Sequence, residues 1–134
     1  MSIWVALFEN NISLNKALSH LLESSEGLTL AGSFFNYSNV LHDIATTKPD
    51  VVLIDIAMQE VNGIDGVRTI RKQFPQLKII MQPVFDNDER IFESLLAGAS
   101  GYILKSIKPD EIISAVCDVE NGGSPLSPAV AKRC

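Results

Sequence analysis

The chain alternates short, uninterrupted apolar runs with stretches of helical periodicity, an order that few folds accept. One run, Val-Val-Leu-Ile, contains no polar residue, which is typical of a strand covered on both faces. The runs predict strands at Ile3–Phe8, Leu28–Ala31, Val51–Ile54, Leu77–Met81 and Gly101–Leu104. Strands separated by helices cannot be joined by tight hairpins, so the pattern predicts a parallel sheet.

Each stretch between these runs carries apolar residues at helical spacing. The predicted helical faces are Leu14, Ala17, Leu18, Leu21 and Leu22; Val40, Leu41, Ile44 and Ala45; Val67, Ile70 and Phe74; Ile91, Leu95 and Leu96; and Ile112, Ile113, Val116 and Val119. Crossovers between parallel strands are almost always right-handed. The sequence therefore predicts an α/β fold: a flavodoxin-like, doubly wound five-stranded parallel sheet with helices on both faces.

Length and composition fit one globular domain. The chain has 134 residues, of which 46% are hydrophobic and 20% are charged, enough to bury a single core. No apolar run reaches the length of a membrane span, and the first residues lack the basic region of a signal peptide. We therefore expect a cytoplasmic protein without membrane contact. Cys117 and Cys134 lack metal-ligand spacing and are expected to be reduced thiols.

The net charge of −5 restricts the partners of the chain. Eleven basic side chains stand against sixteen acidic ones, and the longest basic run is Arg71-Lys72. Because nucleic-acid binding needs a basic surface to neutralise phosphates, we expect no direct nucleic acid contact by this part of the protein.

Polar residues directly follow three predicted strands: Glu9 and Asn10 follow the first, Asp55 the third and Lys105 the fifth. Strand carboxyl ends are where such sheets place their sites. Two acids, an amide and the backbone carbonyl of Ala57 offer the oxygen ligands that Mg²⁺ prefers. Asp55 is a candidate nucleophile for phosphoryl transfer, and Lys105 a candidate contact to the phosphoryl group. A strand-end aspartate is also a common turn residue, so both interpretations stay open.

Two motifs resemble the receiver domains of bacterial response regulators. Val51–Met58 is similar to the phosphoacceptor segment of that family, and Gly98–Lys105 to the segment that ends in its lysine. The resemblance extends from Ile3 to about Ala131. The Gly-Tyr-Ile-Leu-Lys sequence and the ending Leu126-Ser127-Pro128 most resemble the LuxR/NarL-type subfamily.

The resemblance implies a function in two-component signal transduction. A sensor histidine kinase would phosphorylate Asp55, the catalytic phosphoacceptor, Lys105 would contact the phosphoryl group, and Tyr102 would stand at an aromatic switch position. It also implies a homodimer on activation and transcription regulation through a C-terminal helix-turn-helix domain that binds DNA. Residues 1–123 would form the receiver domain, and 124–134 would begin the linker to that domain, which is absent from this chain. No enzymatic activity is implied beyond regulatory self-phosphorylation and self-dephosphorylation.

Three positions depart from the family pattern. Asn10 stands where a metal-ligating acid is expected, so we expect weak Mg²⁺ binding. Pro83 falls where a Thr or Ser hydroxyl bonds the phosphoryl group, and a shift of one residue would place Gln82 there instead. Gln59 replaces a usual proline. Asn10 and Pro83 favour an alternative hypothesis, a degenerate receiver that acts as a protein–protein interaction module without phosphorylation.

Overall fold

The computed structural model of the chain describes residues 2–36, 38–54, 63–81, 98–102 and 109–121. Its elements, in chain order, are β1 (Ile3–Phe8), α1 (Ile12–Ser24), β2 (Leu28–Phe34), α2 (Val40–Thr47), β3 (Val51–Ile54), α3 (Gly63–Gln73), β4 (Lys78–Met81), β5 (Gly101–Tyr102) and α5 (Pro109–Glu120). The strands form one parallel sheet in the order β2-β1-β3-β4-β5. The strand order therefore reverses next to β1, where β2 lies on one side and β3 on the other.

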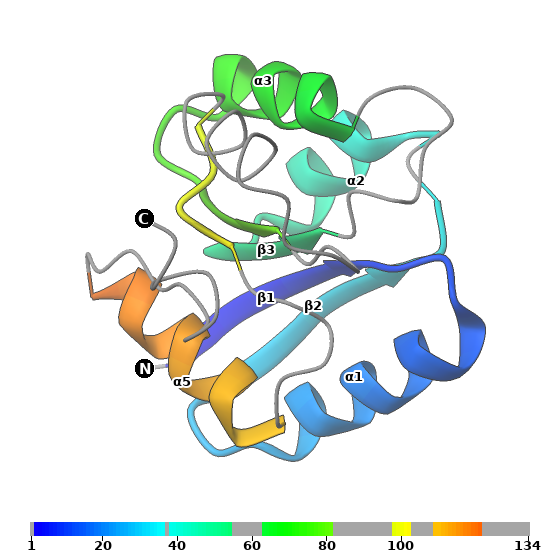
Figure 1. Ribbon diagram of the computed structural model, residues 1–134, viewed down its shortest axis with the longest axis vertical. Coiled ribbons are helices and arrows are strands. Elements are labelled where there is room, and N and C mark those ends of the chain that lie inside the picture. The colour runs from blue at the N-terminus through cyan, green and yellow to red at the C-terminus, as the bar shows by residue number, and fades with distance from the viewer. Residues whose placement is uncertain (1, 37, 55–62, 82–97, 103–108, 122–134) are drawn as a thin grey trace.

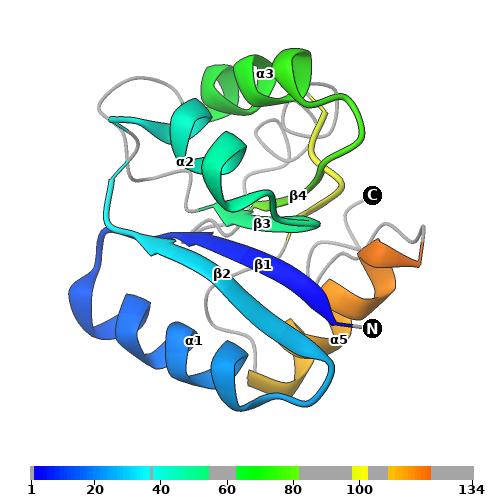
Figure 2. The ribbon, with the colours of Figure 1, turned by 180° about the vertical axis from the view of Figure 1, so that it is seen from behind.

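Helices cover both faces of the sheet (Figure 1). α1 and α5 pack on one face, and α2 and α3 pack on the other, as the view from behind also shows (Figure 2). The prediction of an α/β fold with a parallel sheet between helices is confirmed. The predicted helix around Ile91 and Leu95 lies outside the described residues.

β3 is the strand formed by the unbroken apolar run Val-Val-Leu-Ile, and it is covered by helices on both faces. Val51 and Leu53 pack in the core layer under α1 and α5, whereas Val52 and Ile54 pack in the layer under α2 and α3. All four side chains are fully buried. Since successive side chains of a strand point to opposite faces, a strand with helices on both sides must be apolar at every position.

β2 is longer than the sequence indicated. The prediction ended the strand at Ala31, but pairing with β1 continues to Phe34 after a shift in register. The shift occurs next to Gly32, where a Cβ atom would lie 2.8 Å from the Phe34 ring. That ring stacks on Phe8, with 4.9 Å between ring centroids. The small and polar residues Gly32 and Ser33 hid this half of the strand from the hydrophobic pattern.

The predicted face of α1 packs on the core at Leu14, Leu18, Leu21 and Leu22, and differs at one position. Asn15, Leu18 and Leu22 are buried, whereas Ala17, which was predicted to face the core, is exposed. The amide of Asn15 is therefore part of the buried face, and the methyl group of Ala17 is not.

Asn11 caps the start of α1, because its Oδ1 accepts the backbone N–H of Leu14 at 3.0 Å. We expect Asn11→Ala to lower the free energy of unfolding by about 1 kcal/mol, since the first turn loses a hydrogen-bond acceptor. Urea denaturation measures this loss. Asn39→Ala is the matched control, because Asn39 precedes α2 without making a side-chain capping bond. An equal loss in both variants would contradict the capping role.

Candidate functional site

Neighbouring strands end in one row across the sheet. Phe8 of β1 pairs with Ile54 of β3, Ile54 pairs with Met81 of β4, and Met81 pairs with Tyr102 of β5. Glu9 is the residue that follows Phe8, so it stands at the carboxyl edge of the sheet beside the point where the strand order reverses. This is the place where doubly wound sheets hold their ligands.

Glu9 is fully buried at this edge, although it is an acid. Its backbone N–H donates to the carbonyl of Phe34 at 3.0 Å, and its Oε2 accepts the backbone N–H of Asn11 at 3.0 Å. A buried carboxylate needs hydrogen bonds or a positive charge to be stable. Asn10, the next residue, is exposed. The two predicted ligands of this segment therefore have very different surroundings.

The donor atoms of this segment fit a hard cation. The carboxylate of Glu9 and the amide oxygen of Asn10 are ligand types that Mg²⁺ accepts, and Glu9 is held in place by its hydrogen bonds. Within the described residues, no three His, Cys, Asp or Glu side chains gather in a group that could hold a metal. Mg²⁺ at this segment would keep water molecules among its ligands, as it usually does in proteins.

The other predicted site residues stay predictions. Asp55, Ala57, Pro83 and Lys105 lie outside the described residues. For Tyr102 the structure describes the backbone, which pairs with β4, and not the side chain.

Asn15 is a buried residue that the sequence reasoning missed. Its Nδ2 donates to the carbonyl oxygens of Glu9 at 3.0 Å and Phe34 at 3.1 Å. Its Oδ1 accepts hydrogen bonds from the hydroxyl groups of Ser19 at 3.2 Å and Ser33 at 2.5 Å. The amide is 1% exposed and uses both donor hydrogens and both acceptor positions. It thereby connects α1 to the ends of β1 and β2.

A cleft of about 610 Å³ lies at the opposite, amino edge of the sheet. Its lining comes from the segments that precede β3 and β4 and from the ends of helices, and includes Lys48, Phe74 and Glu120. Large apolar clefts are common ligand sites. This cleft, however, lies at the other end of the strands from Glu9 and takes no part in the candidate site.

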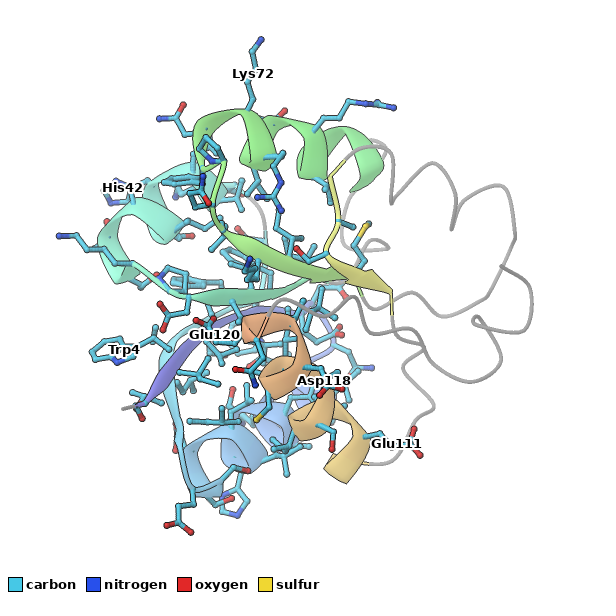
Figure 3. All side chains as sticks on the ribbon, turned by 90° about the vertical axis from the view of Figure 1, so that its left-hand side faces the viewer. Trp4, His42, Lys72, Glu111, Asp118 and Glu120 are labelled. Atoms are coloured by element: carbon cyan, nitrogen blue, oxygen red, sulfur yellow. The ribbon has the colours of Figure 1, made fainter. Side chains whose placement is uncertain are left out.

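Trp4 also lies at the amino edge and corrects the prediction of a wholly buried first strand. It is 47% exposed and projects outward (Figure 3), whereas the residues from Val5 to Phe8 are fully buried. Pairing of β1 with β3 begins at Val5, so Trp4 lies beyond the first paired residue of these two strands. Two hydrogen bonds connect the Trp4 backbone to Asp50. The Trp4 N–H donates to Asp50 Oδ2 at 2.9 Å, and the Asp50 N–H donates to the Trp4 carbonyl at 2.7 Å.

Arg71 ties the end of α3 to the segment before β5. Its guanidinium donates to the carbonyl of Gly98 at 2.8 and 3.1 Å, to that of Pro75 at 2.9 Å and to that of Phe74 at 3.3 Å. Burial lowers the pKa of Arg71 through desolvation. Its neighbour Lys72 points away from α3 into solvent (Figure 3). The longest basic run of the chain therefore does not present its two charges on a common surface.

Comparison with known proteins identifies the family. Residues 5–117 match the response regulator receiver domain. The chain belongs to the response-regulator receiver family. The receiver is 35% identical over 128 residues to the transcriptional regulatory protein MctR of Rhizobium johnstonii. The aligned region covers 96% of this chain and 60% of that protein. It thus spans about 60% of the length of the curated relative.

Solved structures share the fold of the receiver. A LuxR-family two-component response regulator from Aurantimonas sp. SI85-9A1 gives a TM-score of 0.92 at 22% identity, over 99% of this chain and 95% of that one. The isolated receiver domain of RcsB from Salmonella enterica serovar Typhimurium, determined with the phosphomimetic BeF₃⁻, gives 0.89 at 19% identity, over 99% of both chains. At these identities the likeness shows the fold alone.

Family membership confirms the resemblance to response-regulator receivers and the function of the chain as a receiver domain of two-component response regulators. Such domains are in general signalling modules rather than enzymes, and they generally bind Mg²⁺ at an acidic pocket. Among the helices in the described ranges, none has the length and apolar character to cross a membrane.

Proposed function

We propose that this receiver is a phosphorylation switch in which Asp55 accepts a phosphoryl group from a sensor histidine kinase. The proposal rests on the pairing of Phe8 with Ile54, the last residues of β1 and β3. Glu9 follows one of these residues and is buried at the edge, and Asp55 follows the other in the chain. Because neighbouring parallel strands end at a common edge, we expect the two carboxylates to share one site.

In the proposed reaction, a carboxylate oxygen of Asp55 attacks the phosphorus of the donor. The bond between phosphorus and the leaving group breaks, and an acyl phosphate remains on Asp55. The ammonium group of Lys105 pairs with a phosphoryl oxygen as a point charge. Glu9, Asn10, Asp55 and the carbonyl of Ala57 would hold Mg²⁺, which offsets the negative charge of the phosphoryl group when it is bound.

The exposed Asn10 predicts that this site binds Mg²⁺ weakly. An amide oxygen carries a partial charge where a carboxylate would carry a full one, and cation affinity follows the number of charged ligands. The burial of Glu9 acts in the other direction, because a carboxylate already held by hydrogen bonds loses less freedom when a cation binds.

The output of the switch is proposed to be transcriptional. Residues 1–123 form the receiver, in the full five-stranded doubly wound arrangement, and residues 124–134 lead to a helix-turn-helix domain. The names of the curated relatives and their greater length support this reading. Phosphorylation would act through the switch positions Pro83 and Tyr102 and favour a homodimer. The net charge of −5 supports DNA binding by the output domain rather than by the receiver.

Intact-mass spectrometry after incubation with acetyl phosphate, with and without Mg²⁺, tests the proposal. We expect a phosphoryl adduct that requires Mg²⁺ and disappears in Asp55→Asn, because the amide lacks the nucleophilic carboxylate. Asp118→Asn is the matched control, since Asp118 is an exposed acid on α5 (Figure 3) and should leave the adduct unchanged.

A folded protein that forms no adduct at any Mg²⁺ concentration would contradict the switch for small phosphoryl donors. The interaction module that works without phosphorylation, which Asn10 and Pro83 favour, would then replace it.

A further inference from the structure

Glu9 and Asn15 are the buried polar residues among those that the structure describes, and they lie against each other. The proposed function uses Glu9 as a ligand but gives Asn15 no part. Burying an amide lowers stability unless every polar atom is paired. The pairing of Asn15 is directed at one place, the end of β1 next to the candidate site.

The Nδ2 group of Asn15 binds the carbonyl oxygens at which β1 and β2 end. It donates to Glu9 at 3.0 Å and to Phe34 at 3.1 Å, and the N–H of Glu9 donates to the same Phe34 carbonyl at 3.0 Å. Both backbone polar groups of Glu9 are thus held. Because the backbone of a residue restricts the rotamers open to its side chain, fixing the Glu9 backbone limits where the Glu9 carboxylate can lie.

Two hydroxyl groups fix which way the amide of Asn15 points. Ser19 on α1 and Ser33 on β2 both donate to its Oδ1, and Ser19 also contacts Ser33 at 3.0 Å. With Oδ1 held by these donors, Nδ2 must face the strand ends. The cluster Asn15–Ser19–Ser33 therefore has one orientation that satisfies all its members.

We propose that Asn15 is a positioning residue that holds Glu9 in place for the cation needed in phosphoryl transfer to Asp55. The inference rests on the proposed function. Groups that orient a metal ligand typically change metal affinity by about 10- to 100-fold when they are removed. Asn15 acts on Glu9 through its backbone, so we expect an effect at the lower end of this range.

The test is a titration of the chain with MgCl₂, followed by NMR through the backbone amide signals of Glu9, Asn10 and Asn11. We expect Asn15→Ala to weaken Mg²⁺ binding about tenfold. The rate of adduct formation with acetyl phosphate should fall at low Mg²⁺ and recover at saturating Mg²⁺, because the nucleophile is intact. Val119→Ala, a buried change at the far end of α5, controls for general loss of stability and should leave Mg²⁺ affinity unchanged.

Ser33→Ala keeps the proposal testable if Asn15→Ala does not fold. It removes one donor to the Asn15 oxygen and leaves Nδ2 in place, so we expect Mg²⁺ binding to weaken about twofold, the lower end of what one hydrogen bond contributes. If the unmodified chain binds Mg²⁺ and forms the adduct while both variants match it, Asn15 is structural and the inference is wrong. If the unmodified chain does neither, the proposed function fails first and the inference fails with it.

Discussion

Phe8→Ala is expected to lower the free energy of unfolding by about 3 to 5 kcal/mol, the usual loss for a buried aromatic side chain. Phe8 is fully buried in the core layer under α2 and α3, and its ring stacks on Phe34 at 4.9 Å with 22° between the ring planes. The substitution removes both the buried area and the aromatic pair, and it leaves a cavity between rigid neighbours. Such a loss is a large part of the total stability of a small domain.

Trp4→Ala provides the control on the same strand. Trp4 has the larger side chain but is 47% exposed, so we expect its loss to lower the free energy of unfolding by about 1 kcal/mol. Urea denaturation followed by far-ultraviolet circular dichroism measures both variants, because Trp4 is the one tryptophan of the chain and fluorescence would be lost with it. Equal losses in the two variants would show that burial does not set the stability of β1.

The elements that periodicity could predict are those that lie between two helical layers. β1 and β3 have the predicted bounds, since a strand buried on both faces must be apolar throughout. β2 was cut short at Ala31 because it lies at the edge of the sheet, where Gly32 and Ser33 are compatible with pairing. A pattern based on hydrophobicity cannot detect a strand segment that is held by backbone hydrogen bonds and a register shift.

The position of the candidate site in the fold could be predicted from the sequence, but the buried contacts around it could not. The sequence put Glu9 at the carboxyl edge, where the structure also has it. Asn15 was missed because its partners, Ser33 and Phe34, are 18 and 19 residues away and belong to the part of β2 that the pattern did not include. Asn15 lies three and seven residues before Leu18 and Leu22, a helical spacing that places it on their buried face. Because an amide is polar, a search for apolar residues did not include it.

Gly98→Ala is the second substitution with a large expected effect, a loss of about 3 kcal/mol or more in the free energy of unfolding. Gly98 has a φ of +117°, and a Cβ atom there would lie 2.8 Å from Cγ and 3.0 Å from Nε of Arg71. The backbone strain alone amounts to about 1 to 2 kcal/mol for a residue with a side chain. Arg71 cannot move aside without breaking charged hydrogen bonds to Gly98 and Pro75, each of which contributes about 1.5 to 3 kcal/mol.

Gly27→Ala separates the strain from the collision. Gly27 also has a positive φ, +84°, but nothing lies within 4 Å of the Cβ that alanine would add, so we expect the strain of about 1 to 2 kcal/mol alone. Adding Arg71→Ala to Gly98→Ala removes the contacts with Cγ and Nε and leaves only the Cβ of residue 71, at 3.1 Å. In a double-mutant cycle measured by urea denaturation, the two changes should then fall short of additivity by about 1 to 2 kcal/mol. Full additivity would mean that the cost at Gly98 lies in its backbone conformation and that Arg71 only binds the carbonyl beside it.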